Sequence, residues 1–136
     1  MPPAKRGPDD PLEWLGRARA HLTRAKADRD LTGVLYEDLC FDAQQAAEKA
    51  IKAVLVARGV AFPRTHAVAD LLTIAAANGV RIPDEMRDAP KLTRYAVETR
   101  YPGPWEDVTR EDHSQAVELA EVTLKWAESL IGSEPA

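Results

Sequence analysis

The sequence predicts an all-α protein: one domain built as an up-and-down bundle of four to five helices. Apolar residues recur at spacings of three and four along several segments, whereas no segment shows the alternation typical of a β-strand. The expected connections between helices are short, which favours antiparallel neighbours. A chain of 136 residues fits one domain with a core of its own, and its single cysteine excludes an internal disulfide bond.

The helical domain is expected over residues 11–131, between a loose tail of residues 1–10 and a short tail of residues 132–136. Its first helix is predicted over residues 11–27. Asp10 can cap this helix, Pro11 suits the first helical position, and an Asp-x-x-Glu capping box would be completed three residues after the cap. The apolar face consists of Leu12, Leu15, Ala18, Leu22 and Ala25.

The second helix is expected from Val34 to Arg58, with Gly59 as its stop. Its apolar stripe contains several alanines, which would let another helix approach closely. The opposite side is polar and predicts a solvated face, although a few apolar residues there indicate a second packing surface that could meet a partner subunit. The polar side carries Glu37, Asp38, Asp42, Gln44, Gln45, Glu48, Lys49 and Lys52, interrupted by Phe41, Leu55 and Val56.

Three more helical segments are expected after the turn that follows the second helix. Thr65 can cap a helix that starts at His66 or Ala67 and ends at Asn78-Gly79. A fourth helical region lies between Asp84 and Thr99, and the proline within it must break or restart the helix.

The last helix is expected from Arg110 to Ile131, with a Thr-x-x-Asp capping box that begins at Thr109. Apolar residues occupy more than half of its circumference. A helix of this kind must be covered on several sides, inside a bundle or in a dimer interface.

Composition excludes several classes of function. The net charge of −4 argues against strong non-specific binding of nucleic acid, but it is compatible with a local basic pocket. Cys and His residues do not form a zinc pattern and no Gly-rich phosphate loop is present, so we expect no metal and no cofactor. No long apolar stretch or signal peptide is visible, so we expect a cytoplasmic protein that does not contact a membrane.

One polar patch stands out from the solvated helix faces. Arginines beside tyrosine and tryptophan suit the binding of a phosphate with a stacked base. Alternatively, the aromatic rings pack the loop onto the bundle and the arginines form ordinary surface ion pairs. The patch consists of Arg94, Tyr95, Glu98, Thr99, Arg100, Tyr101 and Trp105.

Two sequence runs resemble segments of HEPN domains: Ala-Gln-Gln-Ala-Ala-Glu-Lys-Ala at residues 43–50 and Glu-Thr-Arg-Tyr-Pro at residues 98–102. The resemblance extends over about residues 11–131. It implies a helical bundle that pairs into a homodimer. It also implies a link to RNA-cleaving toxins that are often encoded beside a minimal nucleotidyltransferase acting as antitoxin.

The ribonuclease motif of that family is an arginine, four to six residues and a histidine, often extended to Arg-x4-His-x-Tyr with a tyrosine that can be adenylylated. Arg94 and Tyr101 match this motif, but Thr99 stands where the histidine belongs. A threonine hydroxyl cannot take up or release a proton at neutral pH, whereas histidine can. Loss of such a group typically lowers a rate by about 10²–10⁴-fold.

Other residues are candidates for parts of the same site. His66 is a weak candidate to replace the missing histidine, and it could equally be an ordinary residue at a helix start. Asp38 or Asp42 could pair with Arg94 across the bundle, or could simply be solvated. Three further residues are expected to be structural: His21 and His113 at the surface, and Cys40 in the core.

Three functions remain open on the sequence alone. The first, which we favour, is a HEPN dimer that binds a nucleotide or RNA, or docks to a nucleotidyltransferase, without efficient catalysis. The second is an active metal-independent ribonuclease toxin with a variant site. The third is a purely structural helical partner. The first relies on Arg94, Arg100, Tyr101 and Trp105 for nucleotide or RNA binding, with Tyr101 as the residue that could be adenylylated.

Overall fold

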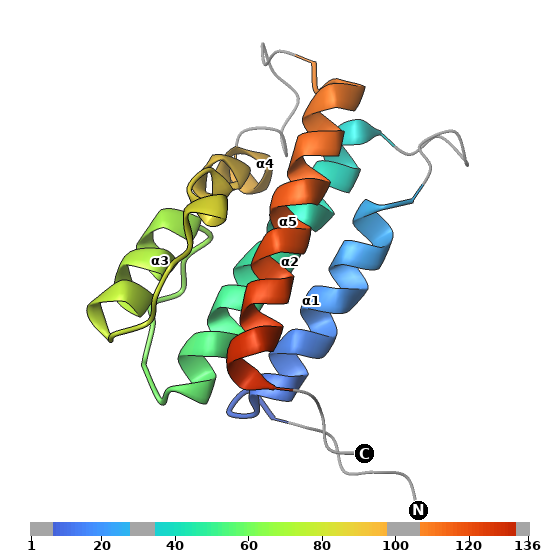
Figure 1. Cartoon of the computed structure of the whole chain (residues 1–136). Coiled ribbons are helices and arrows are strands. Elements are labelled where there is room, and N and C mark those ends of the chain that lie inside the picture. The colour runs from blue at the N-terminus through green and yellow to red at the C-terminus, as the bar shows by residue number, and fades with distance from the viewer. Residues whose placement is uncertain (1–6, 28–34, 98–106, 133–136) are drawn as a thin grey trace, which may run out of the picture.

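The computed structural model describes residues 7–27, 35–97 and 107–132, and every regular element in these ranges is a helix (Figure 1). The all-α fold class is therefore confirmed. The elements are α1 (Pro11–Ala25), α2 (Tyr36–Ala57), α3 (Val68–Ala77), the 3-10 helices η1 (Asp84–Met86) and η2 (Ala89–Thr93), α4 (Arg94–Val97) and α5 (Arg110–Ile131).

Helix α2 lies at the centre of the molecule, between α1 and α5, and packs most extensively against these two. In Figure 1, α1 runs antiparallel to α2, as short connections predict, whereas α5 runs in the same direction as α2. Helix α3 and the short segments that follow it cover another side of α2. The bundle therefore has three long helices and one side built from short ones.

The close packing around α2 rests on small side chains. All of its alanines except the last, Ala57, have no exposed surface, and the larger apolar residues of the core lie between and around them. Small residues bring helix backbones together, and the dispersion energy of many close atoms then stabilises the bundle. The fully buried alanines of α2 are Ala43, Ala46, Ala47, Ala50 and Ala53.

The expectation that the polar side of α2 is solvated is wrong for four residues. Gln44, Gln45, Glu48 and Lys52 are all buried. Among the described residues, no buried side-chain nitrogen or oxygen lacks a hydrogen-bond partner. These side chains can therefore be buried because they bond to one another and to neighbouring segments.

The apolar residues on that side of α2 are at least partly buried within their own chain. Leu55 is fully buried in the core, and Phe41 and Val56 are partly buried. The side chains of Lys52 and Phe62 meet there, with Lys52 Nζ 5.6 Å from the centre of the Phe62 ring. The turn after α2 thus supplies part of the cover that the sequence attributed to a partner subunit.

Several helix ends follow local rules that the sequence predicts. The Asp10 side chain accepts a hydrogen bond from the Leu12 amide, and Thr109 forms a complete capping box with Asp112. Gly59 ends α2 with a φ of 69°, a conformation that favours glycine. The box expected at α1 is not completed: the backbone amide of Asp10 donates to the Gly7 carbonyl at 3.0 Å, and Glu13 pairs with Arg17 at 2.9 Å.

The region between residues 84 and 99, expected as one broken helix, contains several short helices, and two of them are more tightly wound than an α-helix. It consists of η1, η2 and α4. Pro90 lies in the first turn of η2, where its missing amide proton costs no hydrogen bond. The buried side chains of Met86, Leu92 and Tyr95 anchor these short segments to the core.

Two histidines are less exposed than the sequence suggested. His21 is half-buried, and its Nδ1 lies 2.9 Å from the Asp42 carboxylate. His113 is also half-buried; its Nε2 bonds to the carbonyl of Ala25, and its ring lies 5.7 Å from that of Tyr36. Both imidazoles thus connect helices, and the prediction of surface residues is wrong for them.

The residues just before α1 contact that helix. Residues 7–10 form a turn in which the Pro8 carbonyl accepts a hydrogen bond from Trp14 Nε1 at 2.8 Å, while residues 1–6 lie outside the described part of the chain. Of the helices that the structure describes, none combines the length and apolarity that crossing a membrane requires.

Candidate functional site

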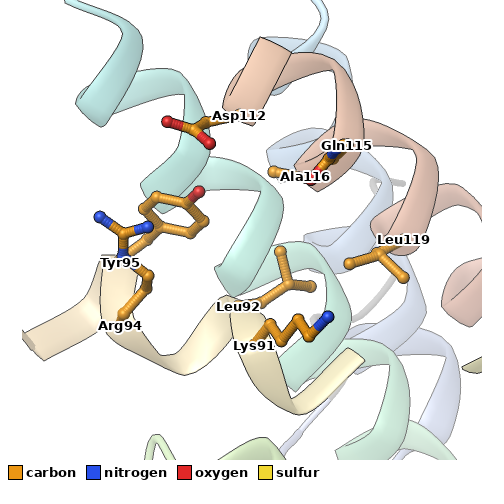
Figure 2. A pocket seen from close by; sticks show the side chains of 8 residues that line it. All are labelled: Lys91, Leu92, Arg94, Tyr95, Asp112, Gln115, Ala116 and Leu119. Atoms are coloured by element: carbon orange, nitrogen blue, oxygen red, sulfur yellow. The ribbon is translucent and has the colours of Figure 1, made fainter. Parts of the chain in front are cut away.

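A pocket of about 320 Å³ opens between the η2–α4 segment and α5 (Figure 2). Figure 2 shows Arg94 and Asp112 at one end of the pocket and Lys91 and Leu119 at the other. Leu92, Ala116 and Leu119 give the pocket an apolar part, and Gln115 adds an amide. A pocket of this kind can hold a small aromatic or sugar group beside a charged one.

Arg94 occupies its place because it begins α4 directly after η2. Its guanidinium carbon lies 5.0 Å from the centre of the Tyr95 ring, within the range of a cation–π contact. This contact and the short helix hold the arginine at the pocket. A guanidinium held in this way can donate paired hydrogen bonds to a phosphate or a carboxylate.

Tyr95 supports the pocket from within the bundle. The ring is buried, and its hydroxyl bonds to the Cys40 sulfur on α2. Burial is the main reason that the pKa of Tyr95 is raised to about 12. Cys40 and Asp112 raise this pKa further, whereas the positive charge of Arg94 lowers it. The phenol therefore stays neutral at physiological pH and serves as a fixed wall.

Cys40 is a core residue, as the sequence predicts. Its thiol is fully buried and free, and burial, reinforced by the charge of Asp112, raises its pKa to about 12. A thiol with such a pKa is scarcely ionised at neutral pH and is a poor nucleophile. The cysteine positions Tyr95 and takes no chemical part itself.

Four of the predicted site residues fall outside the described part of the chain: Thr99, Arg100, Tyr101 and Trp105. The structure therefore places the arginine of the motif-like segment, but neither the threonine nor the tyrosine that follow it. Arg94 lies on a described segment and lines the pocket. Its predicted role in binding stays a prediction.

The two acidic residues proposed to support Arg94 have contacts elsewhere. Asp42 faces α1, where its carboxylate lies 2.9 Å from His21 Nδ1 and 3.2 Å from Arg24 Nε. The Asp38 carboxylate accepts a hydrogen bond from the backbone amide of Leu35 at the start of α2. Asp112 on α5, which the sequence suggested only as a capping residue, is the carboxylate that lines the Arg94 pocket.

His66 belongs to a second polar site, just before α3. Its Nδ1 lies 2.8 Å from Oε1 of Glu48, whose side chain is only 1% exposed, whereas the His66 side chain is 62% exposed. Gln44 Nε2 donates to the same Glu48 oxygen at 3.0 Å, and Lys52 Nζ lies 3.0 Å from the other one. An accessible imidazole is thus bonded to a buried carboxylate.

Glu48 is charged in this setting. Burial by itself would raise its pKa, but hydrogen bonds from Gln44, His66 and Lys52, together with the charge of Lys52, outweigh this effect and lower the pKa below its ordinary value. Sequence reasoning missed Glu48 because it placed the residue on a solvated face. The apolar residues that interrupt this face were the available signal that it is covered.

A second pocket, of about 360 Å³, lies beside the first turns of α1. It is lined by Pro8, Glu13, Trp14, Arg17 and Lys49. The pKa of Lys49 is lowered, mainly by burial. The negative charge of Glu48 raises it, whereas the positive charges of Lys52 and Arg17 lower it further. Within the described ranges, no cluster of His, Cys, Asp and Glu side chains is arranged to hold a metal ion.

Comparisons with known proteins agree with this architecture. The crystal structure of TT1696 from Thermus thermophilus has a TM-score of 0.76 and 33% sequence identity, covering 88% of this chain and 97% of that one. The crystal structure of ST0689, an archaeal HEPN homologue, has a TM-score of 0.71 and 26% identity, covering 90% and 98% of the two chains.

The sequence comparisons point to the same family. A protein of Methanocaldococcus jannaschii named "Putative toxin MJ1304" is 30% identical over 129 residues, which cover 79% of this chain and 84% of that protein. The model of the HEPN domain matches residues 12–130. This match takes in nearly the whole helical domain, so the chain belongs to the HEPN domain family.

Proposed function

We propose that this HEPN protein is a toxin-type protein that binds single-stranded RNA through the pocket beside Arg94. The name of the Methanocaldococcus jannaschii relative supports the toxin type. The observation that carries the RNA-binding proposal is the position of Arg94 at a pocket of about 320 Å³ with one aromatic and several apolar side chains. A phosphate on the guanidinium and a nucleoside in the pocket fit this combination.

Because the protein is acidic overall, we expect RNA to bind at one local site and not over a broad surface. With a net charge of −4, the whole surface offers little general attraction for a polyanion. Arg94 and Lys91 supply two positive charges at one pocket, against the single carboxylate of Asp112 that also lines it, and the ion pair of Lys91 with Asp88, at 3.4 Å, lies on an exposed surface. We therefore expect binding of one or a few nucleotides and a moderate dependence on salt.

Thr99 separates binding from cleavage in this proposal. The motif-like segment retains Arg94 and Tyr101, but a threonine at position 99 cannot move the proton that metal-independent cleavage of RNA requires. The favoured function is accordingly RNA binding without efficient cleavage by this segment. An active ribonuclease would need a proton-transfer residue from another part of the fold.

Binding to a short fluorescent single-stranded RNA, followed by fluorescence anisotropy, tests the proposal. We expect Arg94→Ala to weaken binding by ~10-fold or more, because a hydrogen bond to a charged group contributes about 1.5–3 kcal/mol. Arg87→Ala is the matched control, since it removes the same charge from an exposed position seven residues earlier that does not line the pocket. Its affinity should stay within about twofold of the wild type, as expected for a distant surface charge.

Equal affinities of the wild type and Arg94→Ala would overturn the proposed site. If the wild type binds no RNA at all, the structural alternative, a helical module that only contacts other proteins, takes its place. Circular dichroism of each variant shows whether the helical fold is retained. A loss of binding with retained helicity is therefore attributable to the missing guanidinium.

We further propose a homodimer and a minimal nucleotidyltransferase partner, as the family resemblance implies. Tyr101, the residue proposed for adenylylation, lies outside the described part of the chain. Its modification stays a prediction from the sequence motif. Both proposals concern partners and are independent of the RNA-binding test.

A further inference from the structure

The pocket beside the first turns of α1 shares no lining residue with the Arg94 pocket, and the proposed function does not use it. Its volume is about 360 Å³. One lining residue comes from α2, and the others come from α1 and the turn before it. The pocket thus combines an amine, an aromatic ring and an ion pair. These groups belong to Lys49, to Trp14, and to Glu13 with Arg17.

The ring of Trp14 is held in one position by its neighbours. Its Nε1 donates to the Pro8 carbonyl at 2.8 Å. The ring of Phe62 meets it edge to face, with the two ring centres 6.0 Å apart. Trp14 is only partly buried and lines the pocket, so a ligand can reach it. An aromatic ring that is already fixed binds a flat apolar group at a small cost in conformational entropy.

Lys49 supplies the least exposed charge of the pocket. Its side chain is 19% exposed, whereas those of Arg17 and Glu13 are 64% and 30% exposed. Its Nζ donates to Gln45 Oε1 at 3.1 Å and lies 6.0 Å from the centre of the Trp14 ring. Because an ammonium group has three donors, Lys49 can bind an anion in the pocket and still keep its bond to Gln45.

Lys49 shares the buried carboxylate of Glu48 with a second lysine. Glu48 Oε2 lies 3.0 Å from Lys52 Nζ and 3.8 Å from Lys49 Nζ. The other oxygen of Glu48 is bonded to His66. Burial lowers the pKa of Lys49 and the charge of Lys52 lowers it further, in spite of the opposing charge of Glu48. Glu48 therefore compensates the burial of Lys49 only in part, and a further negative charge would stabilise its ammonium group.

The remaining charges of the pocket limit the charge of a suitable ligand. Glu13 Oε1 lies 2.9 Å from Arg17 Nε, so these two side chains balance each other. The lining then has one excess positive charge, that of Lys49. Glu13 in the lining and Glu48 beside Lys49 would both repel a second negative charge on a ligand. The charges thus favour a monoanion over a phosphate monoester.

From these contacts we infer that this pocket binds a small aromatic carboxylate. The carboxylate accepts a hydrogen bond from Lys49 Nζ, and the aromatic group packs against the ring of Trp14. The single negative charge of such a ligand matches the excess charge of the lining. The inference concerns a second site and is independent of RNA binding at Arg94.

Titration of the isotope-labelled full chain with benzoate, followed by NMR through the indole N–H signals, tests the inference. The chain has three tryptophans, and Trp14→Phe and Trp126→Phe each identify one signal by its absence. We expect benzoate to shift the Trp14 signal in a saturable way. The signal of Trp126, whose Nε1 bonds to the Arg81 carbonyl, should stay unchanged.

Three related compounds test which part of the ligand is recognised. Benzamide has the same shape without the charge and should bind at least ~10-fold more weakly, as expected for the loss of a bond between charged groups. Acetate lacks the ring and should cause no saturable shift. Phenyl phosphate should bind more weakly than benzoate. Equal affinities for benzamide and benzoate, or tighter binding of phenyl phosphate, would overturn the assignment of a carboxylate site.

Variants of Lys49 test its role directly. Lys49→Gln removes the charge but keeps an amide that can bond to Gln45, and it should raise the Kd for benzoate by ~10-fold or more. Lys49→Arg keeps the charge and should bind more tightly than Lys49→Gln. Lys125→Gln is the matched control, since it makes the same change at an exposed position of α5 that does not line the pocket. Its Kd should stay within about twofold of the wild type.

The outcomes distinguish this inference from the proposed function. A Trp14 signal that benzoate does not shift overturns the inference and leaves the RNA-binding proposal standing. Equal affinities of the wild type and Lys49→Gln overturn it as well. Arg94→Ala should bind benzoate as the wild type does, and a loss of binding in this variant would place the ligand in the other pocket. Binding of benzoate by a protein that binds no RNA supports the inference and contradicts the proposed function.

Discussion

Glu48 shows how strongly one buried charge depends on its neighbours. A carboxylate that is 1% exposed keeps its charge only because several donors surround it. Gln44, Lys52 and His66 occupy its two oxygens, and Lys49 lies 3.8 Å away. The residue thus links the centre of α2 to the segment before α3. Its removal would leave a buried lysine without its counter-charge.

We predict that Glu48→Gln destabilises the protein at neutral pH and that the difference from the wild type shrinks in acid. The pKa of Glu48 is lower in the folded chain than in the unfolded one, so the charged carboxylate contributes stability above the unfolded value. That contribution is lost as the pH falls through the folded value. Breaking a buried pair on one side costs about 3–5 kcal/mol.

Thermal unfolding of both proteins between pH 7 and pH 3 measures this difference. Glu118→Gln, on the exposed side of α5, is the control and should follow the wild type across the range. A gap between the wild type and Glu48→Gln that stays constant down to pH 3 would contradict the expected direction of the pH dependence. So would a gap that widens in acid.

At the level of the elements, the long helices and the short ones differ in what holds them in place. α1, α2 and α5 follow hydrophobic periodicity and local capping rules, and for this reason the sequence predicts their existence and most of their ends. The segments between Asp84 and Val97 are too short to be stable by themselves. Their conformation depends on the anchoring of Met86, Leu92 and Tyr95 in the core.

We predict that Ala47→Leu is destabilising because α2 is enclosed by its neighbours. Ala47 has no exposed surface, so the extra carbon atoms have no space unless the helices move apart. Overpacking of this kind typically costs about 1–3 kcal/mol. Urea denaturation measures the change in the free energy of unfolding.

The control for this prediction is Ala76→Leu, which makes the same change at an exposed position of α3. Leucine and alanine have similar helix propensities, so this variant should lie within about 0.5 kcal/mol of the wild type. Equal stabilities of the two variants would show that α2 is less tightly enclosed than its buried alanines indicate.

At the scale of the whole molecule, the surface close to Arg94 carries an exposed apolar side chain. Val97, the last residue of α4, is 55% exposed, although it lies only three residues from Arg94. A second copy of the chain that contacts this surface would bury Val97 and bring two Arg94 pockets together. This geometry fits the homodimer proposed above.

We predict that the protein has about twice the 15.0 kDa mass of one chain in solution. Size-exclusion chromatography with light scattering measures this mass. Val97→Asp should shift the equilibrium towards the monomer, because an apolar contact with a second copy would then have to bury a charge.

Leu130→Asp serves as the matched control for the dimer, since Leu130 is also exposed, at 39%, and lies near the end of α5. It should leave the dimer intact. A wild type with the mass of one chain would contradict the dimer. A dimer that only Leu130→Asp dissociates would place the interface at the other end of the bundle.

The sequence by itself determined the all-α class, the long helices with their caps and glycine stops, the buried Cys40, and Arg94 as a candidate binding residue. These features depend on residues that are close together along the chain. Only the tertiary structure decided that Glu48 is buried, that it holds His66, that Asp42 faces α1 and that Asp112 lines the Arg94 pocket. Each of these pairs residues from separate segments, and periodicity along one helix cannot show which neighbouring segment covers a polar face.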